Sequence, residues 1–256
     1  MNVNKNSYTF GFAIAMVVLV ASLLSIAAIS LKPFQDKNVE LEKKQNILNS
    51  VGIKVKREAA EEAYNKYIKD SFVVNSEGEK TNGDAFNIDL AIELKKDIQN
   101  QSFPIFISEK NDKKSYIIPV RGTGLWGPIW GFIALEDDLN TILGAVFDHK
   151  AETPGLGAEI NLPWFQEPFK GKTIFDGDKF MSITVTKGGA KDDDMHAVDG
   201  ISGGTITADG VTAMLEERLG NYVPFFEIMR KELKVKSVLD SLDTESLTVY
   251  SSNIIQ

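Results

Sequence analysis

Three glycine-rich segments carry the residues whose types and spacing could bind a cofactor. They are RGTGLWGP at 121–128, HKAETPGLG at 149–157 and DGISGGTITAD at 199–209. The third lies just before a helical pattern. Glycines and hydroxyls at a helix N-terminus suit a phosphate, because free N–H groups point outward there and the helix dipole favours negative charge. This segment lacks both the Gly-Lys-Ser/Thr ending of a P-loop and any lysine, so a bound phosphate needs another device, such as an ester bond to a hydroxyl.

Each segment also has a purely structural interpretation. The first could be a wide strand connection with Trp126 in the core, or glycines that bring the backbone close to a flat ligand covered by Trp126. The second could be a tight turn that ends a strand. It could also be a turn in which Thr153 caps a helical turn that begins at Pro154 and whose amides bind an anion or a ring edge. His149 fits a local hydrogen bond as well as a functional role. The third could be only a helix cap and a flexible turn.

The composition excludes several classes of function. The chain contains no cysteine, which excludes disulfides, cysteine-ligated zinc or iron–sulfur clusters and thiol catalysis. Its two histidines, His149 and His196, leave little material for a histidine-based metal site. With 28 basic and 36 acidic residues the net charge is −8, which argues against a nucleic-acid partner, since such a protein needs a basic face.

Residues 8–31 predict a single transmembrane anchor. These 24 residues carry no charge, and at about 1.5 Å per residue they span roughly 36 Å, enough for a bilayer core of about 30 Å. A cleaved signal peptide, whose apolar region is about 7–15 residues long, and a buried soluble helix are the alternatives. Lys5 precedes the span and four lysines soon follow it. That count favours a cytoplasmic domain, but long domains translocate regardless of charge, so charge leaves the side undecided.

The rest of the chain predicts one α+β domain with a mainly antiparallel sheet and flanking helices. Helical patterns cover 36–50, 57–70 and 208–233, the last with a bend at Gly220-Asn221, and a helical turn is expected within 158–168. Short runs of β-branched and aromatic residues predict strands from 71 and at 103–109, 115–122, 129–136, 141–150 and 180–188. The predicted organisation is a tail over 1–7, the anchor over 8–31, a helical connecting region over 32–102, a ligand-binding domain over 103–235 and a C-terminal extension over 236–256.

With these segments the chain resembles the family of C subunits of the sodium-translocating NADH:quinone oxidoreductase. The resemblance rests on the anchor, on GTGLWGPIWGFIAL at 122–135, on HKAETPGLGAEI at 149–160 and on KGGAKDDDMHAVDGISGGTIT at 187–207. The last resembles the flavinylation motif Asp-Gly-x-Ser/Thr-Gly-Ala-Thr of FMN-binding domains. In that family a flavin transferase, using FAD as donor, joins FMN by its phosphate to the final threonine.

Carried over residue by residue, the resemblance implies that Thr205 bears a covalent FMN. Asp199 and Gly200 open the motif, and Ser202 fills its hydroxyl position. Gly204 stands where the family usually has alanine, and Thr207 is the alternative acceptor. The cofactor-binding residues implied around the flavin are Ser202, Gly203, Gly204, Ile206, Thr207, Glu152, Thr153, Gly155, Leu156, Gly157, Gly124, Leu125 and Trp126.

The resemblance also implies a place in electron transfer. The flavin would take electrons from metal-bearing membrane subunits of a six-subunit complex and pass them toward the FMN-bearing B subunit, while NADH, quinone and sodium are handled elsewhere. The domain would lie on the periplasmic side of a bacterial inner membrane, and this chain itself would hold no metal and no catalytic residue. Alternatives are the G subunit of the related Rnf electron-transport complex, a membrane-tethered sensory module and a structural subunit with a degenerate flavin site. The chain length and the long region before residue 103 favour the sodium pump.

Overall fold

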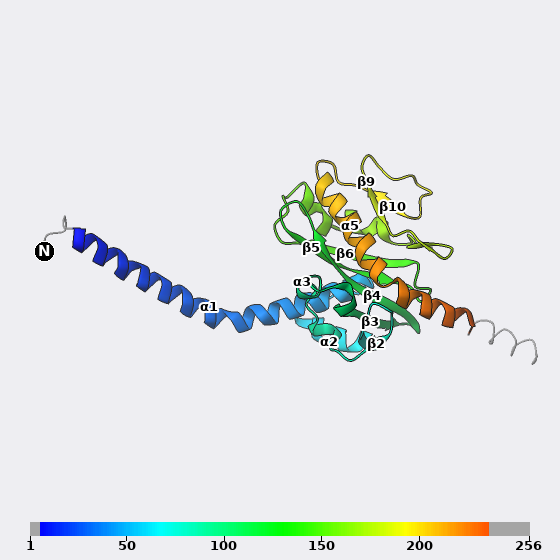
Figure 1. Ribbon diagram of the computed structural model, residues 1–256, viewed down its shortest axis with the longest axis horizontal. Helices are drawn as coiled ribbons and strands as arrows, with labels where there is room; N and C mark the ends of the chain where they lie inside the picture. The colour runs from blue at the N-terminus through cyan, green and yellow to red at the C-terminus, as the bar shows by residue number, and fades with distance from the viewer. Residues whose placement is uncertain (1–5, 236–256) are drawn as a thin grey trace, which may run out of the picture. The chain divides into compact units, whose positions relative to one another are not determined.

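The computed structural model describes residues 6–235, which Figure 1 shows as a coloured ribbon. The chain divides into two units, Met1–Lys44 and Gln45–Gln256. The predicted C-terminal extension, 236–256, lies outside the described residues, as does most of the predicted N-terminal tail.

The first unit is formed by helix α1 (Asn6–Ser50), whose last residues belong to the second unit. The predicted anchor and the predicted helix over 36–50 are one continuous element, with Pro33 inside it. The mean hydropathy reaches 2.8 in its apolar part, and its residues there are exposed. Among the described residues this is the one helix long and apolar enough to cross a membrane, as the sequence predicts.

The second unit is built on a six-stranded antiparallel sheet with the order β2-β1-β3-β4-β5-β6. Four of its strands confirm the four that the sequence predicts between 103 and 150, because each apolar run between turn residues pairs with its neighbour along the chain. The strands of the sheet are β1 (Ile68–Val74), β2 (Lys80–Thr81), β3 (Phe103–Lys110), β4 (Lys113–Thr123), β5 (Pro128–Leu135) and β6 (Ile142–His149).

The segment before β3 is less helical than its sequence pattern suggests. Helix α2 (Ala60–Tyr67) follows the short turn η1 (Arg57–Ala59) and ends three residues before the predicted boundary. The chain then enters β1, which pairs with β3 in register Phe72↔Ile105. Pairing with a distant strand therefore overrides the local helical pattern, and part of the expected connecting region belongs to the sheet. Short turns η2 (Ala85–Asn87), α3 (Leu90–Glu93) and η3 (Ile98–Asn100) complete it.

The predicted strand over 180–188 is wrong as a single element. Its first residue, Phe180, ends β8 (Lys179–Phe180), which forms a hairpin with the preceding β7 (Phe175–Asp176). Residues 184–186 form β9 (Thr184–Thr186). Ser182 between them has a φ of 60°, which breaks the extended chain. β9 pairs in parallel with β10 (Ala197–Asp199), so a local apolar run is divided between two small sheets.

The helical predictions after β6 are confirmed with shifted boundaries. Three short turns cover the region expected to be helical: η4 (Gly157–Asn161), α4 (Pro163–Gln166) and η5 (Glu167–Phe169). Helix α5 (Thr205–Asn221) begins three residues before the predicted start. Helical structure is interrupted at Tyr222 and resumes over 223–235, next to the predicted bend.

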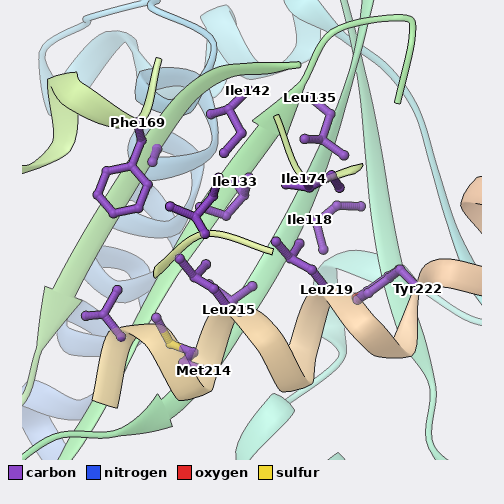
Figure 2. Packing of buried hydrophobic residues seen from close by; sticks show 14 of the residues in the cluster. Ile118, Ile133, Leu135, Ile142, Phe169, Ile174, Met214, Leu215, Leu219 and Tyr222 are labelled. Carbon is purple, nitrogen blue, oxygen red and sulfur yellow. The ribbon is translucent and has the colours of Figure 1, made fainter. Parts of the chain in front are cut away.

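Both faces of the sheet are buried, which explains its nearly continuous apolar runs. Along β4, Ile118 packs in the cluster that includes α5, whereas its neighbour Ile117 packs with Ile47 and Leu48 of α1 on the other face. Figure 2 shows the first cluster, in which Ile118, Ile133 and Leu135 of the sheet lie opposite Met214, Leu215 and Leu219 of α5.

Candidate functional site

The first turn of α5 presents the threonines of the third glycine-rich segment. Thr205 is the first helical residue, and Gly204 caps the helix. The chain enters this turn through Gly203, whose φ of 74° lies in the left-handed region that favours glycine. A Cβ on Gly203 would lie 2.7 Å from the Cδ2 atom of Leu156. The helix therefore begins close against the second glycine-rich segment.

Two further glycines bring α5 and the first glycine-rich loop together. A Cβ on Gly210 would overlap the carbonyl oxygen of Thr123, and one on Gly122 would lie 2.7 Å from the Cβ of Met214. The helix thus rests directly on the end of β4, where the loop 124–127 begins. Close backbone approach of this kind requires residues without a side chain.

These contacts create a cavity of about 220 Å³, here called the loop cavity. The loop that follows β4, the loop that follows β6 and the start of α5 all border this cavity. Its lining residues are Leu125, Glu152, Thr153, Leu156, Gly157, Gly203, Gly204, Thr205, Ile206 and Thr207. All ten are site residues that the sequence predicts. Three other predicted residues, Gly124, Trp126 and Gly155, lie in the same loops but do not line this cavity.

Glu152 is the buried charge of the loop cavity, with only 5% of its surface exposed. Its Oε2 accepts a hydrogen bond of 2.6 Å from the hydroxyl of Thr207, and its Oε1 accepts one of 2.8 Å from the amide of Trp126. Burial by itself raises the pKa of Glu152. The hydrogen bonds from Thr207 and from the amides of Trp126 and Leu125, together with His149, outweigh burial and hold that pKa below its ordinary value.

Glycines also make room for this carboxylate. A Cβ on Gly124 would lie 2.6 Å from Oε1 of Glu152, and one on Gly157 would overlap the hydroxyl of Thr207. The hydrogen bonds of Glu152 with Trp126 and Thr207 therefore connect the second loop to the first loop and to the first turn of α5. Gly124 contributes to the site by this route, although it does not line the loop cavity.

The second loop departs from the predicted helix cap. The helical turn η4 begins at Gly157 with Leu156 as its N-cap, so the prediction that Thr153 caps a turn starting at Pro154 is wrong. Instead, the carbonyl of Thr153 accepts hydrogen bonds from the amides of Leu156 and Ala158, both at 3.1 Å. The local interpretation of His149 is confirmed, because its Nδ1 accepts the amide of Glu152 at 3.1 Å.

The first loop connects β4 with β5, as its structural interpretation predicts, but the part of that interpretation that places Trp126 in the core is wrong. Trp126 is 65% exposed. Leu125, Leu156 and Ile206 are exposed by between 41% and 57% at the loop cavity itself. Large apolar side chains gathered at one cavity provide contact for a flat apolar ligand.

A second cavity of about 450 Å³ also borders the first turn of α5. Thr205 and Gly203 line both cavities. The predicted motif residues Asp199, Gly200 and Ser202 line only this one, here called the lysine cavity because Lys187 also lines it. The sequence analysis did not include Lys187 among the candidate site residues. The only signal was a Lys-Gly-Gly sequence twelve residues before the motif.

Gly204 occupies the position at which the flavinylation motif usually has alanine, and the structure leaves little room there for a side chain. A Cβ at this position would lie 2.9 Å from Cγ2 and 3.0 Å from Cβ of Ile201. Its φ of −102° suits any residue, so the constraint is contact with Ile201 and not backbone strain. Among residues 6–235, no group of three or more His, Asp or Glu side chains could hold a metal ion.

Comparison with known proteins identifies the same region. Residues 124–220 match the FMN-binding domain family. The chain is 30% identical over 241 residues to the C subunit of a Na(+)-translocating NADH-quinone reductase from Vibrio alginolyticus, with 87% of this chain and 94% of the relative covered. It is 32% identical over 228 residues to the corresponding protein from Haemophilus ducreyi, with 81% and 88% covered.

Two solved structures are similar in fold to this chain. The crystal structure of the C subunit of Na(+)-translocating NADH-quinone reductase from Parabacteroides distasonis has a TM-score of 0.72 at 45% identity, with 77% of this chain and 96% of that one covered. The crystal structure of Shewanella oneidensis NqrC has a TM-score of 0.66 at 29% identity, with 75% and 98% covered. Both likenesses support the observed arrangement of a mainly antiparallel sheet with helices.

Proposed function

Because the chain belongs to the family of C subunits of Na(+)-translocating NADH-quinone reductase, we propose that it relays electrons through an FMN joined to Thr205 by a phosphoester bond. As a family member it is an FMN-containing subunit of an oxidoreductase complex, with other subunits as partners. The observation that carries the covalent assignment is the position of Thr205, at the junction of the two cavities.

Burial and hydrogen bonding favour Thr205 over the other hydroxyls of the motif. Thr205 is half-buried and open to both cavities. Thr207 is only 1% exposed, and its hydroxyl donates a hydrogen bond to the Glu152 carboxylate. Esterification of Thr207 would break that hydrogen bond and place a phosphate beside a buried anion. Ser202 is exposed and lines the lysine cavity alone.

The residues present fit FMN by their chemistry. The first turn of α5 offers backbone N–H groups without intrahelical acceptors, which suit a phosphate attached at Thr205. The loop cavity offers Leu125, Leu156 and Ile206 as apolar contacts for a flavin ring. The donors of this first turn and the apolar contacts both adjoin Thr205. A cofactor with a phosphate at one end and a ring at the other needs both kinds of contact.

Attachment to Thr205 is a phosphoryl transfer from FAD, for which the family resemblance implies a flavin transferase. The Thr205 oxygen forms a bond to the phosphorus of the FMN half of FAD, and the bond to AMP breaks. AMP leaves, and the hydroxyl proton is released with it. The product is a phosphodiester that keeps the cofactor on the protein, which gives it a high effective concentration at its binding site.

During turnover the residues of this chain bind and orient the cofactor. A bound flavin supplies the electron-transfer chemistry. Leu125, Leu156 and Ile206 would exclude water from one side of the flavin, and Glu152, whose pKa is held below its ordinary value, would stay ionised and hold both loops on α5.

We extend the proposal to the location and the partners of the chain. Helix α1 anchors the chain in a bacterial inner membrane with the domain in the periplasm, between the metal-bearing membrane subunits and the FMN-bearing B subunit. Residues 8–31 carry no charge, so this helix offers no sodium pathway of its own. Sodium, NADH and quinone are then handled by other subunits.

The test is the intact mass of the denatured full-length chain, produced together with a flavin transferase. The wild type should gain the mass of FMN minus water, and Thr205→Ala should lose that gain. Thr184→Ala, at an exposed threonine of β9, is the matched control and should retain it.

Two outcomes would contradict the proposal. A gain that persists in Thr205→Ala would move the acceptor to another hydroxyl. No gain in the wild type, with a transferase active on another substrate, would refute covalent flavin on this chain and favour a structural or sensory role.

A further inference from the structure

We propose that Lys187 contacts the phosphate of the flavin on Thr205 and that Asp199 and Gly200 of the motif hold this lysine in place. The inference rests on the proposed function, because it needs a phosphate on Thr205. It assigns a ligand contact outside the motif and gives the first two motif residues a physical role.

The lysine cavity brings Lys187 to the acceptor. Lys187, Gly188 and Gly189 form one part of its lining, and residues 199–203 and Thr205 form another. Among the described residues that line either cavity beside Thr205, Lys187 is the one with a positive charge. Lys187 is therefore the lining residue that could supply a cation to a phosphate bonded to Thr205.

The backbone beside Lys187 is fastened to the motif at two points. β9 and β10 pair in parallel with Thr186 opposite Asp199, and the amide of Gly200 donates to the carbonyl of Thr186 at 2.9 Å. The Oδ1 of Asp199 accepts the amide of Ala190 at 2.7 Å. These bonds lie on both sides of Lys187 in the sequence, so they fix the loop that carries it.

The loop also needs its glycines. Gly188 and Gly189 have φ values of 85° and 102°, which reverse the chain directly after Lys187. A Cβ on Gly200 would lie 2.9 Å from the carbonyl oxygen of Thr186, so only glycine allows the motif to approach β9 this closely. Asp199 and Gly200 are thus positioning residues that act through the lysine loop.

The other charged residues that line the lysine cavity are acidic, so Lys187 is needed to balance their negative charge. Asp199 and Asp209 line the same space, and one oxygen of Asp199 is already occupied by the amide of Ala190. A phosphodiester on Thr205 adds a third negative group. Without Lys187 these three groups would share one cavity with only backbone N–H groups to balance them, and like charges at short range repel one another.

The test compares three variants of the full-length chain in detergent with the wild type. Lys187→Met removes the charge, Lys187→Arg keeps it, and Lys191→Met removes a charge from the same loop outside the cavity lining. The first readout is the initial rate of FMN incorporation from FAD at fixed transferase, followed by intact mass. The second is the phosphorus NMR shift of the loaded protein, which reports directly on the phosphodiester.

Lys187→Met should incorporate FMN about three- to tenfold more slowly at low ionic strength, and the difference should shrink as salt screens the charges. Its phosphorus shift should differ from that of the wild type. Lys187→Arg should restore both readouts, and Lys191→Met should match the wild type within about twofold.

Equal rates and equal phosphorus shifts in Lys187→Met and the wild type would overturn the inference. Equal slowing in Lys187→Met and Lys191→Met would also overturn it, because the effect would then be a general attraction of the transferase to the loop. Failure of the wild type itself to take up FMN would instead refute the proposed function, so the two failures are distinguishable.

Discussion

The hydrogen bond between Thr207 and Glu152 should contribute measurably to stability, and Thr207→Val tests it. Valine preserves the shape of the side chain and removes only the hydroxyl. The 2.6 Å bond is donated to a carboxylate that is 5% exposed. Hydrogen bonds to charged groups contribute about 1.5–3 kcal/mol, and a buried acceptor left short of a donor costs a similar amount. We therefore expect the free energy of unfolding to fall by about 2 kcal/mol.

The same substitution should change the pH dependence of stability. The pKa of Glu152 in the folded protein lies below its ordinary value of 4.5, and the Thr207 hydroxyl is one cause. A carboxyl whose pKa falls on folding adds stability above the unfolded pKa, and this stability is lost as the pH drops through the folded pKa. In Thr207→Val the folded pKa moves up toward 4.5. The difference between wild type and variant should therefore narrow as the pH falls below that value.

Urea unfolding of the full-length chain in detergent, followed by tryptophan fluorescence, measures both effects. The three tryptophans of the chain lie at 126, 130 and 164, all in the second unit. Thr184→Val, at an exposed threonine of β9, is the control and should change stability by less than about 0.5 kcal/mol. A similarly small loss in Thr207→Val, or a loss that stays constant from neutral to acid pH, would refute the reasoning.

Two further predictions concern the packing of the site and the anchor. Gly157→Ala places a methyl group against the hydroxyl of Thr207 and should cost about 1–3 kcal/mol of stability and slow FMN loading. Gly127→Ala, where a Cβ has its nearest neighbour 3.8 Å away, should leave both unchanged; equal effects would contradict this view. Deletion of residues 1–35 should give a detergent-free soluble protein with an unaltered urea transition. Deletion of residues 1–50, which also removes two core side chains of zero exposure, should lower the transition midpoint or prevent folding.

Local sequence patterns predicted much of the scaffold. The uncharged run at 8–31 corresponds to the apolar part of α1, and the runs between 103 and 150 correspond to β3, β4, β5 and β6. These elements could be predicted from local sequence because each depends on neighbouring residues. A membrane span needs one long apolar run, and a strand of this sheet needs a short apolar run between turn residues. The patterns failed at 68–70 and 180–188, where pairing with distant strands and a left-handed Ser182 decided the conformation.

The sequence by itself determined which segments make the site. The three glycine-rich loops were identifiable, and resemblance to the FMN-binding family singled out Thr205. Without that resemblance, residue type and position could not rank Thr205 and Thr207, because both precede a predicted helix and both carry the same hydroxyl.

Only the tertiary structure separates the two threonines. It turns Thr207 toward Glu152, which lies 55 positions earlier in the chain, and leaves Thr205 open to two cavities. It also brings Lys187 into a site whose own segment contains no lysine. The physical reason is that burial, hydrogen-bond partners and neighbouring charge depend on which distant segments the sheet and α5 bring together, and no local pattern records those contacts.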